Sequence, residues 1–197
     1  MVIVMAAGAL LHLSNWDNFY VIVGSSAGAL IGLQFVVITL IAGTGKVDSK
    51  QVSAFGTPTV IHFSAALLIS AILSAPWETL AGLRAILGIF GVIGIAYSVR
   101  AILHAVQQKT YEPELEDWLW FFALPLLGYV ILFVAAALLV SQTLRALFMI
   151  AGVSLTLLFV GIHNSWDTVT FVVTTDLAAH LGDRDGAKRN APPTQDS

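Results

Sequence analysis

Apolar residues dominate five stretches of the chain, and polar residues gather between them. Crossing roughly 30 Å of hydrocarbon as an α-helix takes about 20 mostly apolar residues, at a rise of about 1.5 Å per residue. Each stretch is long enough to do so. The pattern therefore predicts an all-α polytopic transmembrane helix bundle with five spans, at about residues 19–43, 58–77, 80–103, 118–140 and 146–173.

The two ends of the chain differ in composition. Met1–Leu13 is apolar, but no Lys or Arg precedes it and no convincing small-residue cleavage site follows it, so we expect it to be retained. Residues 1–18 would then form an apolar segment at the outer interface or against the bundle. Residues 174–197 form a polar tail, which we expect to be disordered from Gly182 onward. The five spans make one domain.

Two arginines lie within the third span without arguing against it. Arg84 and Arg100 are 16 residues apart, which is about 24 Å along a helix, so each can reach the headgroups at one membrane face. Amphipathic indole rings prefer the same interfaces. All five tryptophans lie at or near the ends of predicted spans: Trp16, Trp77, Trp118, Trp120 and Trp166.

Composition supports the membrane class and excludes others. Charged residues make up 11% of the 197 residues, hydrophobic residues 57%, and the mean hydropathy is +0.86, whereas a soluble domain carries about a quarter charged residues. The net charge is -3 and the nine Lys and Arg are scattered, so nucleic acid is not an expected partner. The absence of cysteine removes disulfides, iron–sulfur clusters, thiol nucleophiles and cysteine-based zinc sites. Phosphate-binding loops and serine elbows do not occur in a usable context, so we assign no catalytic residue, metal or enzyme activity.

Positive charge is divided unequally between the two membrane faces. Seven Lys and Arg fall on the side of the first loop, the third loop and the tail, and only Arg84 and Arg145 fall on the other. Cytoplasmic loops retain Lys and Arg during insertion. The asymmetry predicts an N-terminus outside, a C-terminus in the cytoplasm, and a multi-pass protein of the cell inner (cytoplasmic) membrane.

With this orientation, several polar residues fall near the cytoplasmic ends of the spans. Ionisable groups within spans are costly, which makes them candidates for function. His163 and Asp167 are four residues apart and share one helical face, where the carboxylate could hold the imidazole proton. The alternative is structural: water and Arg100 would satisfy Asp167, and His62 would be a hydrogen-bonded packing residue. The candidate inner-leaflet polar site comprises Gln34, His62, Tyr97, Arg100, His163, Asn164 and Asp167.

Small residues form a stripe on the first span. Gly24, Gly28 and Gly32 recur every four residues, a spacing that lets another helix backbone approach closely. We expect packing within the bundle, and the alternative is a homo-oligomeric interface. The third span offers a second smooth surface on which the stripe would pack, formed by Gly88, Gly91 and Gly94.

Two further charged groups lie outside the spans. At the outer face we expect a clasp of Asp17, Glu78 and Arg84, in which Glu78 pairs with Arg84 across the turn before the third span. At the cytoplasmic face, residues 112–117 form an acidic stretch just before the fourth span. We expect a solvated loop whose carboxylates lie near the positive end of that helix, and a divalent-cation or partner-docking site is the alternative.

Four short motifs carry a resemblance to known proteins. On these motifs the chain resembles a family of small bacterial multi-span integral membrane proteins with no established activity. The resemblance spans nearly all of the helical part, implies a bacterial membrane origin, and transfers no catalytic residue. The motifs are Asn15-Trp16, the glycine-rich run of residues 24–35 with Gly32-Leu33-Gln34-Phe35, residues 58–63 with His62-Phe63, and Asn164-Ser165-Trp166-Asp167.

These features support three functions. The first is a channel-like or transporter-like homo-oligomer whose inner polar site lines a solute or proton path. The second is a non-transporting accessory or regulatory membrane protein that docks on a partner complex through its glycine faces and acidic loop. The third is a membrane redox subunit in which His62 and His163 ligate a haem. The lipid bilayer is the partner that the composition itself implies.

Overall fold

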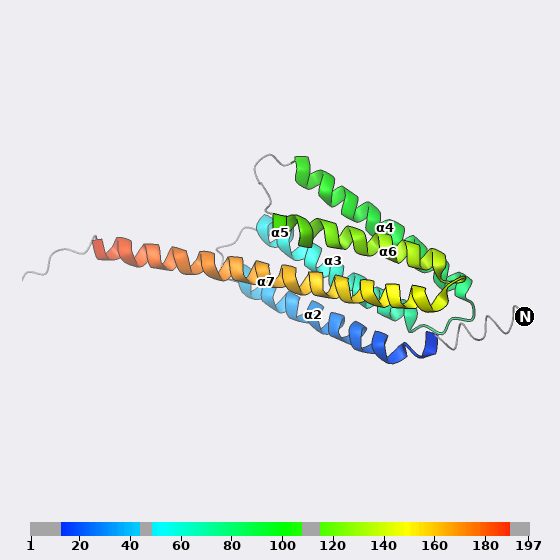
Figure 1. Ribbon diagram of the computed structural model, residues 1–197. Helices are drawn as coiled ribbons and strands as arrows, with labels where there is room; N and C mark the ends of the chain where they lie inside the picture. The colour runs from blue at the N-terminus through cyan, green and yellow to red at the C-terminus, as the bar shows by residue number, and fades with distance from the viewer. Residues whose placement is uncertain (1–12, 44–48, 108–114, 190–197) are drawn as a thin grey trace, which may run out of the picture.

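The computed structural model describes residues 13–43, 49–107 and 115–189, and all regular secondary structure within them is helical (Figure 1). The predicted N-terminal segment therefore lies outside the described residues as far as residue 12, and so does the tail beyond Arg189. The elements are α2 (Asp17–Gly43), α3 (Ser49–Leu73), α4 (Leu80–Gln107), the short α5 (Leu115–Asp117), the π-helix η1 (Trp118–Ala123), α6 (Leu124–Leu138) and α7 (Thr143–Arg189).

The five long helices form an elongated antiparallel bundle, beyond which α7 continues at one end (Figure 1). α3 packs between α2 and α7, α7 packs on α6, and α6 packs on α4. α4 touches α3 only lightly, so it lies at the edge of the bundle. We call the end with the turns at residues 74–79 and 139–142 the turn end, and the opposite end, where α2 finishes and α5 begins, the loop end.

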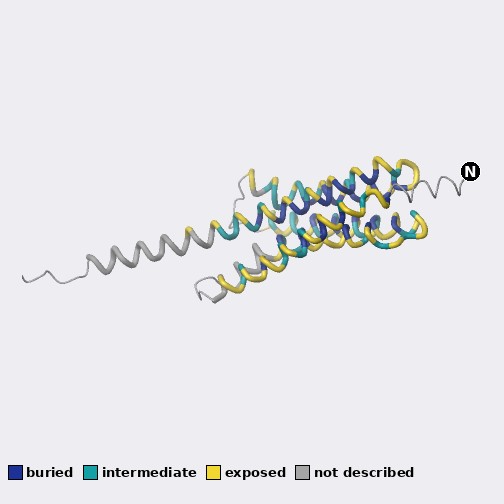
Figure 2. The backbone as a smooth tube through the Cα atoms, turned by 90° about the horizontal axis from the view of Figure 1, so that it is seen from below, coloured by how far each residue is buried: buried dark blue, intermediate teal, exposed yellow. Residues whose placement is uncertain are grey.

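Among the residues that the structure describes, four helices are long and apolar enough to cross a membrane. They are Asp17–Leu40, Leu80–Gln107, Trp118–Leu138 and Thr143–Thr170, while the apolar part of α3, Thr57–Leu73, is shorter. Large apolar side chains such as Ile22, Phe148 and Phe159 are exposed on the outside, and exposed residues line the outer faces of the helices (Figure 2). A helix in lipid satisfies its own backbone hydrogen bonds, so this surface suits a membrane-embedded bundle.

The boundaries of three helices differ from those that the sequence predicts. α3 begins at Ser49 and runs through Pro58, which was expected at the first helical turn, and it ends at Leu73 before Trp77. α4 continues to Gln107 rather than ending near residue 103. α7 continues to Arg189, past Gly182, where the composition predicts disorder. Extending an existing helix avoids the cost of nucleation, and Ala, Leu, Lys and Arg in this segment favour helix.

A π-helix precedes the sixth helix because of a proline. Pro125 has no N–H to donate to the carbonyl of Phe121, and its ring would clash with that carbonyl in a regular α-helix. The wider turn of η1, Trp118–Ala123, accommodates this defect. Such single π turns are frequent at functional sites.

The glycine surface of α4 packs against α6 and not against α2. A Cβ on Gly91 would lie 3.0 Å from the backbone nitrogen of Phe133, and the ring of Tyr129 lies directly on Gly94. The expectation that this surface packs on the glycine stripe of the first span is therefore wrong. Close contact between α4 and α6 requires glycine here because any side chain would separate the two backbones.

The glycine stripe of α2 is divided in the structure. Gly24 meets α3, where an added Cβ would lie 3.0 Å from Cβ of Ser70. Gly28 and Gly32 have no such neighbour within 4 Å. Of the three, Gly24 supports packing within the bundle, whereas Gly28 and Gly32 leave a smooth surface open.

The hairpin between α3 and α4 is closed by an indole ring. Trp77 Nε1 donates a hydrogen bond of 2.6 Å to the carbonyl of Ile72, and the ring lies 3.1 Å from the Cβ position of Gly82. Asp17, Glu78 and Arg84 are all exposed, and no ion pair joins them to one another among the described residues. Trp77 therefore takes the role that the sequence assigned to the Glu78–Arg84 clasp, because a buried ring gains more from packing than two solvated charges gain from pairing.

Candidate functional site

A contact between α3 and α7 sets the level of the candidate site. A Cβ on Gly161 of α7 would lie 2.5 Å from the ring of Phe63 of α3, so the two backbones come close there. The helices are antiparallel (Figure 1). His62 and Thr59 of α3 therefore lie level with Asn164 and Ser165 of α7, towards the loop end from this contact.

The polar side chains at this level lie on two sides of the contact. Ser165 points towards α2, where its Oγ donates a 3.0 Å hydrogen bond to Oε1 of Gln34. His62 lies one residue before Phe63, and Asn164 lies three residues after Gly161. In an antiparallel pair these two offsets rotate both side chains to the same side, opposite to Ser165, because each residue turns the helix by about 100°.

Several polar atoms at this level are buried without a hydrogen-bond partner. Gln34, His62 and Asn164 are 4%, 1% and 0% exposed. Nε2 of Gln34, Nδ1 of His62, and both amide atoms of Asn164 make no hydrogen bond. An unpaired buried polar group costs roughly 1–3 kcal/mol. The interior at this level, on both sides of the α3–α7 contact, is therefore chemically suited to water, a proton or another small polar species.

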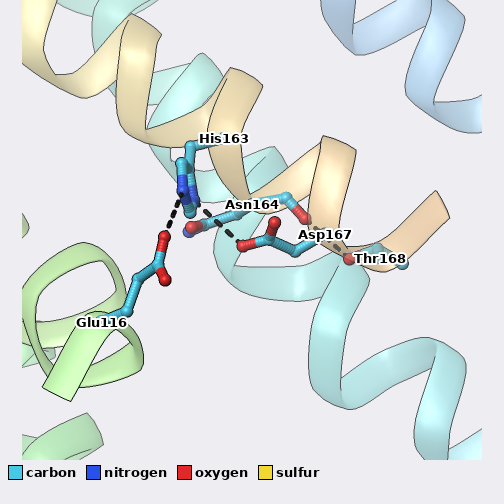
Figure 3. Close-up of polar contacts among 5 residues, drawn as sticks. All are labelled: Glu116, His163, Asn164, Asp167 and Thr168. Carbon is cyan, nitrogen blue, oxygen red and sulfur yellow. Dashed lines mark hydrogen bonds and ion pairs between the residues drawn. The ribbon is translucent and has the colours of Figure 1, made fainter. Parts of the chain in front are cut away.

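His163 lies between two carboxylates at the edge of this interior (Figure 3). Its Nδ1 is 3.0 Å from Oδ2 of Asp167, and its Nε2 is 3.6 Å from Oε1 of Glu116 in α5. The imidazole also stacks on Trp120 of η1, with ring centroids 4.0 Å apart and planes 8° apart. A protonated imidazole in this position has an N–H for each carboxylate, whereas a neutral one has a single N–H and can donate to only one of them.

Asn164 neighbours His163 along α7 and lies about one helical turn from Asp167, so it shares a side of the helix with that carboxylate. Its backbone carbonyl accepts a 2.8 Å hydrogen bond from the hydroxyl of Thr168 (Figure 3), and both atoms of its side-chain amide are buried without a hydrogen-bond partner. The contacts of His163 join Glu116 and Asp167. From the rotation of the helices we infer the order Glu116, His163, Asp167, Asn164 and His62 across the bundle, and we call this row of side chains the file.

The outer members of this file are more exposed than its inner members. Glu116 and Asp167 are 72% and 43% exposed, and His163 is 24% exposed. Asn164 and His62 are buried completely or almost so. The file thus leads from the surface at the loop end into the unpaired polar atoms of the interior.

Tyr97 and Arg100 lie elsewhere. Tyr97 lines a separate, largely apolar cavity of about 240 Å³ between α3, α4 and α6, together with Tyr129. Arg100 is exposed on α4, which packs on α6, and no ion pair links it to Asp167 among the described residues. The structure therefore does not support Arg100 as the residue that ties α4 to α7.

Three contributors were not predicted as members of the site. Glu116 was read as part of a solvated acidic stretch, Trp120 as an interfacial ring, and Ser165 only as part of a motif. Glu116 lies just before the fourth span and Trp120 in its first turn, and only the packing of α5 and η1 against α7 brings them to His163. A proline at position 125 preceded by acidic and aromatic residues was the available signal for an irregular turn.

A haem between His62 and His163 does not fit this arrangement. The contact of Phe63 with Gly161 leaves no space for a porphyrin between α3 and α7. Both nitrogens of His163 already face carboxylates, and its ring face is covered by Trp120. Within the described ranges, no cluster of three or more potential ligands is arranged to hold a metal ion.

No family model, curated protein or solved structure matches this chain significantly. The functional interpretation therefore rests on the file and on the bundle that holds it.

Proposed function

We propose that this protein is a transporter-like membrane protein that takes up protons, or a small polar solute, from the loop end. The observation that carries this proposal is the file from Glu116 through His163, Asp167 and Asn164 to His62. Exposed carboxylates attract cations, an imidazole between them can accept and donate protons, and unpaired buried atoms can receive the species inside.

The far side of the bundle supports a transporter over an open pore. Beyond the level of His62, most of the core towards the turn end is apolar, with buried side chains such as Ile69, Leu73, Leu147 and Ile150. The hydroxyls of the buried Ser70 and Ser154 donate to carbonyls of their own helices. Polar species do not cross such a layer unaided. Passage to the other face then requires a rearrangement of the helices or a shared axis in a homo-oligomer, for which Gly28 and Gly32 offer the open surface.

The proposal includes five spans with the N-terminus outside and the C-terminus in the cytoplasm of a bacterial inner membrane. α3 has 25 residues, enough to cross, and its apolar surface is short. That helix lies between α2 and α7, so it needs less lipid-facing surface than the other four. The Lys and Arg asymmetry places the loop end in the cytoplasm.

Reporter fusions test this topology. Fusions after Lys46, after Lys109 and in the tail should report a cytoplasmic location, and fusions at Ser14 and Arg145 should report the outside. Both termini on one side would contradict an odd number of spans.

Proton flux into proteoliposomes, read by an enclosed pH-sensitive dye, tests the function. Wild-type protein should conduct above empty vesicles, and His62→Phe and Asn164→Leu should each abolish the difference. Ser154→Ala is the matched control, because Ser154 is buried in α7 but its hydroxyl bonds to the carbonyl of Ile150. If the folded wild-type protein gives no proton flux above that of empty vesicles, the hypothesis of proton transport is wrong. Small polar solutes are then tested in the same vesicles.

A non-transporting accessory role is the second candidate. α7 continues from the bundle to Arg189 as a single helix, beyond the other helices (Figure 1). A helical extension of this kind can bind a partner protein at the membrane surface. Absence of flux together with a stable copurifying partner, lost on truncation after Thr170, would favour this role.

A further inference from the structure

An apolar groove runs along the outside of the bundle between α4 and α6. Its volume is about 580 Å³. On α4 the groove is hollow because Ala85 and Gly88 carry little or no side chain, and Phe133 and Val140 form the opposite wall. Arg84 is the one charged residue in its lining.

Arg84 has no role in the site at the loop end and no acidic partner. It is exposed at the turn end of α4, and neither Glu78 nor Asp17 pairs with it among the described residues. A guanidinium at a membrane face is well suited to bind phosphate, because its planar donors match two phosphate oxygens. Its position at one end of an apolar groove gives the groove a charged end and an uncharged end.

The length of the groove matches one leaflet. From Arg84 to Ile93, the groove follows α4 for about 14 Å at about 1.5 Å per residue. Half of a hydrocarbon core roughly 30 Å thick is about 15 Å. A chain that begins at the headgroup level beside Arg84 therefore ends near the middle of the bilayer beside Ile93.

The charge at the end of the groove favours a phospholipid as the occupant, because its phosphate would pair with Arg84. A single acyl chain would contact the small residues on the floor of the groove along its whole length. We propose that the groove binds an anionic phospholipid of the leaflet at the turn end, with one acyl chain between α4 and α6 and its phosphate on Arg84.

Native mass spectrometry of the delipidated full chain tests this proposal. The probes are phosphatidylglycerol and phosphatidylcholine with identical acyl chains, added in competition. The wild type should retain phosphatidylglycerol in preference, and Arg84→Gln should lower that preference about fivefold, the factor equivalent to about 1 kcal/mol for one basic residue at an anionic surface. Arg145→Gln is the matched control, because Arg145 is exposed at the same end and its Nη1 bonds to Gln142 instead.

A second pair of variants tests the acyl part of the groove. Ala85→Phe should fill the groove and lower retention of both lipids, while Ala96→Phe, at an exposed position of the same helix outside the groove, should not. Free glycerol 3-phosphate should not displace the lipid.

Three results would overturn the proposal. The first is equal retention of the two lipids by the wild type. The second is displacement by glycerol 3-phosphate, which would indicate a headgroup site alone. The third is a dimer that Ala85→Phe dissociates, which would identify a second copy as the occupant.

Discussion

Phe63 of α3 lies against the Cβ position of Gly161 in α7, with ring carbon Cε1 2.5 Å from where a methyl group would stand. This contact joins the two most central helices of the bundle. It also sets the level at which His62 and Asn164 meet the interior, because each lies within one helical turn of it. Stability and function are therefore coupled at this point.

Gly161→Ala should destabilise the protein. The added methyl group overlaps the ring of Phe63, and overpacking of this kind costs about 1–3 kcal/mol. Thermal unfolding in detergent measures the change. Gly152→Ala is the control on the same helix, because nothing lies within 4 Å of its Cβ position; a loss of stability there equal to that at Gly161 would show that the contact is not the cause.

Gly24→Leu and Gly28→Leu should behave differently. The first places a side chain against Ser70 and should lower thermal stability, whereas the second enters open space and should leave the isolated chain as stable as the wild type. Size-exclusion chromatography with light scattering measures the oligomer in parallel. If Gly28→Leu converts a larger assembly into monomers, the open half of the stripe is the interface of a homo-oligomer; if both variants unfold alike, the division of the stripe is wrong.

Trp77→Phe should weaken the hairpin at the turn end. It keeps an aromatic ring near Gly82 but removes the N–H that donates to Ile72, a loss of about 0.5–1.5 kcal/mol. Glu78→Gln is the neighbouring control and should have almost no effect, because Glu78 is exposed and has no ion-pair partner among the described residues. Denaturant titration in detergent gives the free energy of unfolding of both variants. A larger loss for Glu78→Gln than for Trp77→Phe would indicate that the charged clasp, and not the indole ring, closes the hairpin.

A double-mutant cycle should show coupling between His163 and Glu116. Contacting residues deviate from additivity by roughly 0.5–3 kcal/mol, and Nε2 of His163 lies 3.6 Å from Oε1 of Glu116. The free energies of unfolding of His163→Gln, Glu116→Gln and the double variant in detergent should therefore deviate from additivity by an amount in this range. Strict additivity would show that the carboxylate does not hold the imidazole and that packing on Trp120 does.

A second cycle tests the inner part of the file. His62→Ala and Asn164→Ala should couple more strongly than His62→Ala and Asp167→Asn, because Asn164 lies between the other two residues. Thermal stability and proton flux are both measured for each variant. Stronger coupling of His62 to Asp167 would place those two residues in contact and remove Asn164 from the file.

The sequence by itself determined the class of the protein. Long apolar stretches are stable in lipid, so hydropathy predicted an all-helical bundle with five spans. The structure confirms the all-helical bundle, and four of its described helices are long and apolar enough to cross a membrane. Helix ends were less predictable. Pro58 was expected to begin a helix and lies inside one, because packing between α2 and α7 outweighs one missing hydrogen bond.

Tertiary structure alone decided which helices touch and which polar residues meet. A glycine surface in a sequence does not specify which helix will pack on it. Gly91 and Gly94 pack against α6, although by sequence the glycine stripe of α2 was an equally suitable partner. The spacing of His163 and Asp167 along one helix predicted their contact, since local geometry fixes it. The contact of His163 with Glu116 joins segments far apart in the chain, and it depends on how η1 and α7 pack, which no local pattern encodes.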